Sequence, residues 1–198
     1  MKRLLLLAAC LAAAGCSDSK VVVHASLASS GQPVADLPVW VLPYDRQALM
    51  DSLAQEAGQP EPAIPAPLVT QLEGLTARER QLAAAGDPRL AAFRAQRAAV
   101  QKQVDSIRAA RVQWREQVFA PFDSLAQARQ AEMGVTAAVD TTDARGVARI
   151  GADEGRVWIY AVYVLPDVTL EWNLPVTVRG DSTVVRLTRE NAKERKFY

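Results

Sequence analysis

Cysteine, histidine and long apolar runs are scarce in this chain of 198 residues. Both cysteines, Cys10 and Cys16, lie near the N-terminus, so the rest of the chain can form no disulfide and needs an ordinary hydrophobic core. The single histidine, His24, is the only imidazole that could activate a nucleophile, and it lies within a β-type segment where a surface histidine is ordinary. The sequence also lacks a phosphate-binding loop and a cysteine–histidine cluster. We therefore predict no enzymatic activity and no catalytic residue.

Acidic residues offer one arrangement that could hold a metal ion. Asp140, Asp143, Asp153 and Glu154 border short β-type segments and could gather at one end of a sheet, where oxygen ligands suit a hard cation. Asp143 is explained more simply by an Asx turn, in which its side chain accepts hydrogen bonds from the backbone that follows. We therefore predict no metal site and no cofactor.

The longest apolar run, residues 4–15, follows Lys2 and Arg3 and ends in small residues. This order is typical of a secretory signal, and roughly 12 residues fall short of the ~20 that a transmembrane helix needs. We expect residues 1–15 to be removed, which leaves 21 basic residues against 22 acidic ones, a net charge of −1. That balance argues against nucleic acid as a partner.

The end of this run, residues 13–16 (AAGC), has small residues directly before a cysteine. It resembles the lipobox of bacterial lipoproteins, and the resemblance implies that Cys16 carries lipid and that the chain is anchored to a membrane. Residues 7–10 (LAAC) are similar, but cleavage there would leave an apolar region of about six residues, below the usual ~7–15. Ser17 stands where an Asp favours the inner membrane, so the outer membrane is the expected location. The alternative is an ordinary signal peptide with an incidental cysteine.

Two groups of β-type segments flank the middle of the chain. Alternating and β-branched residues between Gly, Pro, Asp and Ser predict seven strands. These are residues 21–27, 37–43, 135–140, 147–150, 157–165, 169–178 and 183–187. Such punctuation indicates a β-sandwich of about seven antiparallel strands. Its first strands belong to residues 16–45 and its remaining strands to residues 134–191, with residues 192–198 as a C-terminal tail.

The residues between the two groups, 46–133, change to a helical period. Asp45 can cap a first helix, and four prolines make residues 58–67 a linker that no helix accommodates. Asp87 marks a second start, after which apolar residues follow a heptad over residues 88–120, until a proline that should kink or end the helix. We predict a long α-helical hairpin that interrupts the sandwich as an arm outside its core, which makes the fold α+β overall.

Three stretches carry a further pattern: residues 31–39 (GQPVADLPV), 142–150 (TDARGVARI) and 155–160 (GRVWIY). They resemble the G-x-P-V opening and the T-D-x-x-G and G-x-Y stretches of the carboxypeptidase regulatory-like, transthyretin-related modules. The helical insertion departs from that family, as does Val157-Trp158, where a Tyr is usual. The resemblance implies a seven-stranded sandwich, and it carries over no catalytic residue.

Two groups of side chains could carry binding. The first consists of arginines of the return helix, Arg108, Arg111 and Arg115. They could meet anionic lipid or cell-wall polymer, or they are a solvated face paired with acidic neighbours. The second consists of aromatic residues of two strands, Trp158, Tyr160 and Trp172. They could stack on sugar rings, or they are large core residues.

The segment 157–165 is apolar at nearly every position, so neither of its faces is polar. A sandwich strand normally turns one face to water, so the second face is either covered or an exposed binding patch. We expect this strand to be central, with its outer face covered by the hairpin base through Phe119, Phe122 and Leu125.

These patterns predict a non-catalytic lipoprotein of the cell envelope that serves as a structural or protein-interaction module. Its expected partners are the membrane, through the N-terminal lipid, and envelope proteins or cell-wall polymer. The alternative is a polysaccharide-binding module of the envelope.

The anchor is testable by fractionation of cells. Cys16→Ser should move the protein from the membrane fraction to the soluble fraction, because the lipid attachment atom is lost, while Cys10→Ser should change nothing. Unchanged membrane association of the Cys16→Ser protein would contradict the anchor.

Overall fold

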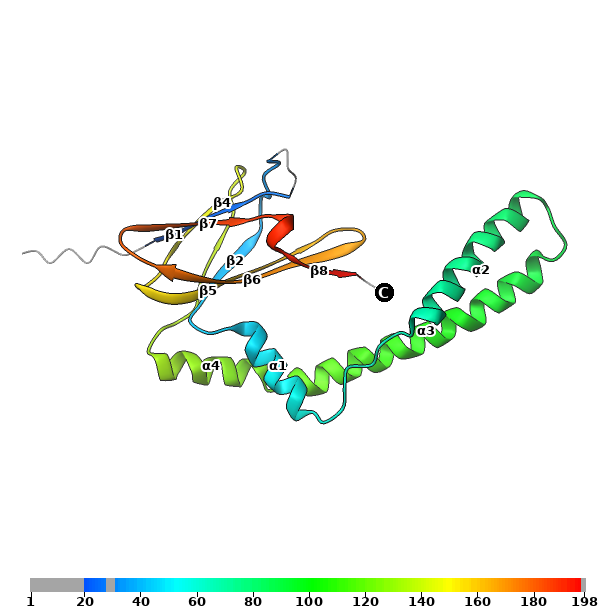
Figure 1. The fold of residues 1–198 in the computed structure, drawn as a ribbon, viewed down its shortest axis with the longest axis horizontal. Helices are drawn as coiled ribbons and strands as arrows, with labels where there is room; N and C mark the ends of the chain where they lie inside the picture. The colour runs from blue at the N-terminus through cyan, green and yellow to red at the C-terminus, as the bar shows by residue number, and fades with distance from the viewer. Residues whose placement is uncertain (1–19, 28–30, 197–198) are drawn as a thin grey trace, which may run out of the picture.

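The computed structural model describes residues 20–27 and 31–196. The signal segment, Cys10, Cys16 and Ser17 lie outside the described residues, so lipidation stays a prediction. The described chain is a mixed α+β structure with eight strands in two sheets and four α-helices (Figure 1). The strands are β1 (Lys20–Ala25), β2 (Pro38–Leu42), β3 (Ala138–Thr141), β4 (Val147–Gly151), β5 (Gly155–Val164), β6 (Val168–Val178), β7 (Ser182–Leu187) and β8 (Lys193–Lys196). The helices are α1 (Arg46–Glu56), α2 (Ala66–Ala84), α3 (Leu90–Phe119) and α4 (Phe122–Met133), with a 3-10 turn η1 (Arg189–Asn191).

All seven predicted strands are present, and β8 is an eighth, in the segment expected to be a tail. One sheet has the order β4-β1-β7 and the other β3-β2-β5-β6-β8. β1 pairs with β4 antiparallel and with β7 parallel, so the expectation of purely antiparallel strands is wrong for this pair. The alternation of side chains that predicts a strand does not record the direction of its neighbour. β5 lies between β2 and β6, which confirms its central place.

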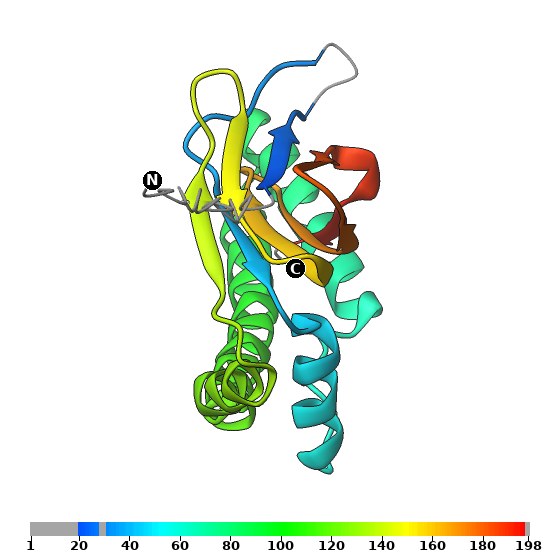
Figure 2. The same ribbon diagram turned by 90° about the vertical axis from the view of Figure 1, so that its left-hand side faces the viewer.

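Both sheets contribute to one hydrophobic core. Val21 and Val23 of β1 point into it, and Ile159 of β5 and Leu170 of β6 meet them there, each with no exposed surface. Period-two alternation on these strands therefore selects one face of each sheet for the interior. The other face of the five-stranded sheet, called the outer face below, is turned toward α1 and α4 (Figures 1 and 2).

The connection from β3 to β4 is built by Thr142 and the turn after it. Thr142 is 2% exposed, and its hydroxyl accepts a hydrogen bond from Leu37 N and donates one to Val34 O. Asp143 Oδ1 accepts from the backbone N–H of residues 145 and 147, at 2.9 and 3.0 Å, which confirms the Asx turn. Gly146 has φ +73°, and a Cβ there would lie 2.5 Å from Ala25 O, so only glycine fits.

The helices begin and end close to the expected places. Asp45 caps α1, because its Oδ1 accepts a hydrogen bond from Ala48 N at 3.1 Å. α3 begins at Leu90, two residues after the expected start, although Asp87 does accept a hydrogen bond from the backbone N–H of Arg89. Pro121 ends α3, and α4 starts directly after it. None of the described helices is long and apolar enough to cross a bilayer.

The insertion has two parts. α1 and α4 lie against each other beneath the outer face, whereas α2 packs along α3 and the pair extends away from both sheets (Figure 1). Leu82, Val100 and Val104 are buried between α2 and α3. We call residues 66–107 the arm. None of residues 46–133 is in the core cluster of the two sheets, as predicted, but only residues 66–107 extend away from the sheets as an arm.

The arm should be removable. A short Gly/Ser loop in place of residues 65–107 would join Ile64 to Arg108, which line the same groove. We expect a cooperatively unfolding protein with a melting temperature within a few degrees of the parent, because no core residue of the sheets is lost and closing the loop costs little. Replacing all of residues 46–133 should lower the melting temperature clearly, since it uncovers the outer face. Loss of cooperative unfolding in the shorter deletion would show that the arm belongs to the core.

Candidate binding cleft

A cleft of about 820 Å³ lies between the outer face of the five-stranded sheet and the root of the insertion. One wall comes from β5, β6 and β8. The opposite wall comes from the Pro-rich linker and the last turns of α3, and α1 closes the space between the two walls. The cleft is therefore lined by segments that are far apart in the chain, from α1 to the last strand β8.

The sheet wall follows from strand register. Side chains that alternate with the buried Ile159 and Ala161 point to the outer face, and among these Tyr160 lies opposite Asn173 and Val162 opposite Glu171. β8 then places Lys193 opposite Glu171. Asn173, Glu171 and Lys193 thus form a polar strip on the outer face, beside Tyr160 and Val162.

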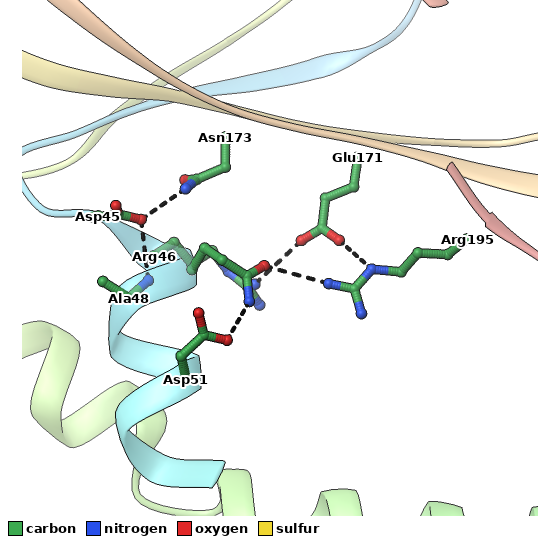
Figure 3. A network of polar contacts seen from close by, with 8 residues as sticks. Asp45, Arg46, Ala48, Asp51, Glu171, Asn173 and Arg195 are labelled. Atoms are coloured by element: carbon green, nitrogen blue, oxygen red, sulfur yellow. Dashed lines mark hydrogen bonds and ion pairs between the residues drawn. The ribbon is translucent and has the colours of Figure 1, made fainter. Parts of the chain in front are cut away.

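Glu171 is the centre of the polar contacts on this wall (Figure 3). Its Oε2 lies 2.6 Å from Arg195 Nε, an ion pair without the alignment of a hydrogen bond, and its Oε1 lies 3.8 Å from Arg46 Nη1. Arg195 also donates to Gln47 Oε1, and Gln47 donates to Asp51. One carboxylate on β6 therefore links the first turn of α1 to the edge strand β8.

Asp45 gives a second link between α1 and the sheet. The carboxylate oxygen that caps α1 also accepts a hydrogen bond from Asn173 Nδ2, at 2.7 Å (Figure 3). The start of α1 is thus fixed to β6 at both Asp45 and Arg46.

Arg46 is also held between two aromatic rings. Its guanidinium carbon lies 4.5 Å from the ring centre of Tyr160 and 4.8 Å from that of Phe122. Such contacts contribute on the order of 0.5–1 kcal/mol each at partly exposed sites. Burial raises the pKa of the Tyr160 hydroxyl above its ordinary value of 10.0, although the nearby Arg46 charge opposes this shift. Tyr160 is therefore a neutral hydroxyl at physiological pH.

The helix wall presents two arginines one turn apart. Arg111 and Arg115 both approach Glu61 Oε1, at 3.6 and 3.2 Å. Arg111 Nε also donates to Pro62 O at 2.9 Å, and Trp114 Nε1 donates to Gln59 O at 3.1 Å. The spacing of four residues brings the two guanidinium groups to one face of α3, and these bonds fasten the linker to that face.

The structure brings together three of the six residues predicted for binding. Tyr160, Arg111 and Arg115 line the cleft. Arg108 lies farther out, in an apolar groove of about 360 Å³ between α2 and α3, and pairs with Asp105.

The two tryptophans lie elsewhere. Trp158 does not line the cleft, and the Arg156 guanidinium lies 5.1 Å from its ring centre. The prediction that Trp172 could bind a ligand is wrong, because this residue is 1% exposed. Its indole N–H donates to Thr188 O and Asn191 Oδ1, each at 2.9 Å, so both its ring and its polar atom are used within the core.

The sequence interpretation missed Arg46, Glu171, Lys193 and Arg195. Lys193 and Arg195 lie in the KERK segment, which has no apolar residue that would predict a strand. Glu171 did carry a signal, since it is the one acidic residue among the apolar and aromatic residues of β6. A charge in such a strand needs a partner of opposite charge.

Three of the four acidic residues considered for a cation accept hydrogen bonds from the backbone instead. Asp140 Oδ2 accepts from Arg149 N, and Glu154 Oε1 accepts from Gly180 N. In the part of the chain that the structure describes, no three acidic, histidine or cysteine side chains form a group that could hold a metal ion. His24 is exposed on β1.

No model of a known protein family, no curated protein and no solved structure matches this chain. The resemblances to lipoproteins and to regulatory-like modules therefore stay predictions.

The side chains that cover the outer face of β5 differ in part from the predicted ones, which are Phe119, Phe122 and Leu125. Phe122 reaches Tyr160 through Arg46, whereas Leu125 is 39% exposed and does not line the cleft. Phe122→Ala should lower the free energy of unfolding by about 1–2 kcal/mol, less than a fully buried ring because Phe122 is half-buried. Leu125→Ala is the control and should change stability by less than about 0.5 kcal/mol in a denaturant titration. Equal effects of the two substitutions would contradict this cover.

Proposed function

We propose that this protein is a non-catalytic lipoprotein of the bacterial cell envelope, with a β-sandwich as its base, that contacts other envelope proteins through its arm. The observation that carries the proposal is the division of the insertion: its root is fixed to the sheet, while residues 66–107 extend away from it (Figure 1). The arm contains 18 of the 30 residues of α3, residues 90–107, a length of about 27 Å. An arm of this length presents a large surface away from the base.

The sandwich assignment is supported by the shared core and by the turn after β3. Residues of both sheets pack into one cluster. The Asx turn of Asp143 and the left-handed Gly146 give a physical role to the T-D-x-x-G pattern. They belong to one of the three stretches on which the resemblance to regulatory-like modules depends.

The chemistry of the cleft favours binding over catalysis. Among the described residues, its lining holds no histidine, cysteine or serine, and its arginines are engaged in ion pairs with Glu61 and Glu171. The polysaccharide alternative relied on stacking surfaces, but Trp172 is in the core and Arg46 lies over the Tyr160 ring. The proposal therefore rests on protein contacts.

Photo-crosslinking in cells tests this function. A photoreactive amino acid at Gln71 of α2 or Ala98 of α3, both exposed, should give covalent adducts with envelope proteins. The same probe at Val184, 59% exposed on β7, is the control and should give few. Absence of adducts from both arm positions, or equal adducts from Val184, would contradict an arm that contacts proteins.

A further inference from the structure

The cleft concentrates positive charge. Its lining holds five basic side chains and three acidic ones, an excess of two positive charges in a chain whose overall formal charge is only +1. The basic side chains are Arg46, Arg111, Arg115, Lys193 and Arg195. A concave surface with partly apolar walls focuses such a field and favours anionic ligands.

The excess positive charge of the cleft is divided between its two walls. On the sheet wall Arg46 and Arg195 share Glu171, and on the helix wall Arg111 and Arg115 share Glu61. Each pair of arginines is thus balanced by a single carboxylate. An anion in the cleft would be attracted from both sides.

The guanidinium groups of the cleft also have N–H donors that the described contacts do not use. The side chains of Arg111, Arg115 and Arg195 are 30, 42 and 39% exposed, and each guanidinium has five N–H donors. The bonds to the linker, to Glu61 and to Gln47 use only some of these. Charge-assisted hydrogen bonds to a further carboxylate therefore remain possible on both walls.

The edge of the sheet indicates what kind of anion fits. β8 is the last strand of the five-stranded sheet, and no described strand pairs with its other edge. A free edge offers backbone N–H and C=O groups to an extended peptide. Lys193 and Arg195, two residues apart on β8, both line the cleft, so an added strand with acidic residues at alternate positions would face them.

We propose that the cleft and the outer edge of β8, with which no described strand pairs, bind an extended acidic peptide segment of a partner protein, with Asp or Glu at alternate positions. This inference rests on the proposed function and names the chemistry of the partner at the root of the arm. A peptide is favoured over an anionic sugar chain because an extended peptide repeats its N–H and C=O groups at the spacing of the β8 backbone.

Fluorescence anisotropy with the full-length protein in detergent tests this site. The probe is a labelled eight-residue peptide of alternating Glu and Thr, and the matched probe has Gln in place of Glu. The Glu peptide should bind with an affinity that falls as salt rises, and the Gln peptide should bind at least about tenfold more weakly. A third probe with Pro in place of Thr cannot donate to β8 at those positions and should also bind more weakly.

α3 supplies a matched pair of variants. Arg111→Gln with Arg115→Gln removes the helix-wall charges and should weaken binding of the Glu peptide about tenfold or more. Arg94→Gln with Arg97→Gln is the control, because these arginines share Glu79 in the same manner on the arm, outside the cleft. The control should bind within about twofold of the parent. Circular dichroism and the unfolding temperature of both double variants show that each remains folded.

Three results would overturn the inference. They are absence of binding by the Glu peptide, an equal loss in both double variants, and equal binding by an oligogalacturonate of similar charge, which would assign the cleft to anionic sugars. Equal binding of the Pro-containing probe would overturn the part played by β8. Arm crosslinks that persist alongside any of these results would leave the proposed function standing.

Discussion

The position of the insertion depends on one carboxylate, Glu171. Its side chain is only 11% exposed, and an ionised group there would be costly without partners of opposite charge. The partners come from two distant segments, Arg46 at the start of α1 and Arg195 on β8. The same ion cluster therefore seats the helices on the outer face and attaches a strand that has no apolar residues of its own.

Around this ion cluster, polar and apolar contacts join different parts of the molecule. The apolar contacts of the core join the two sheets, whereas polar contacts join the insertion to the sheets. These polar contacts are the hydrogen bond between Asn173 and Asp45, the ion pair between Arg46 and Glu171, and the position of Arg46 between the rings of Tyr160 and Phe122. Polar contacts of this kind fix geometry more than they add stability. Such an attachment orients the insertion on the sheet without merging it with the core.

Local signals explain what could be predicted from the sequence. Seven strands, the Asp45 cap and the turn at Asp143 each depend on residues close together in the chain, and each is present. The parallel pairing of β1 with β7, the existence of β8 and the hydrogen bond from Asn173 to Asp45 depend on residues far apart, and no local pattern records them. For the same reason the basic residues of one predicted helix indicated Arg111 and Arg115 as candidate binding residues, whereas Glu171, whose partners lie on other elements, was missed.

The position of β1 has a mechanical consequence. β1 is the middle strand of its sheet, bonded along one edge to β4 and along the other to β7. Tension applied along the strand from Lys20 would load both ladders in shear, so that many hydrogen bonds resist together instead of opening one after another. If the chain is pulled from its N-terminal side while its arm is held by a partner, the force passes through the core between the two sheets. Unfolding under this force would begin with β1 sliding between β4 and β7, and not with an edge strand peeling away.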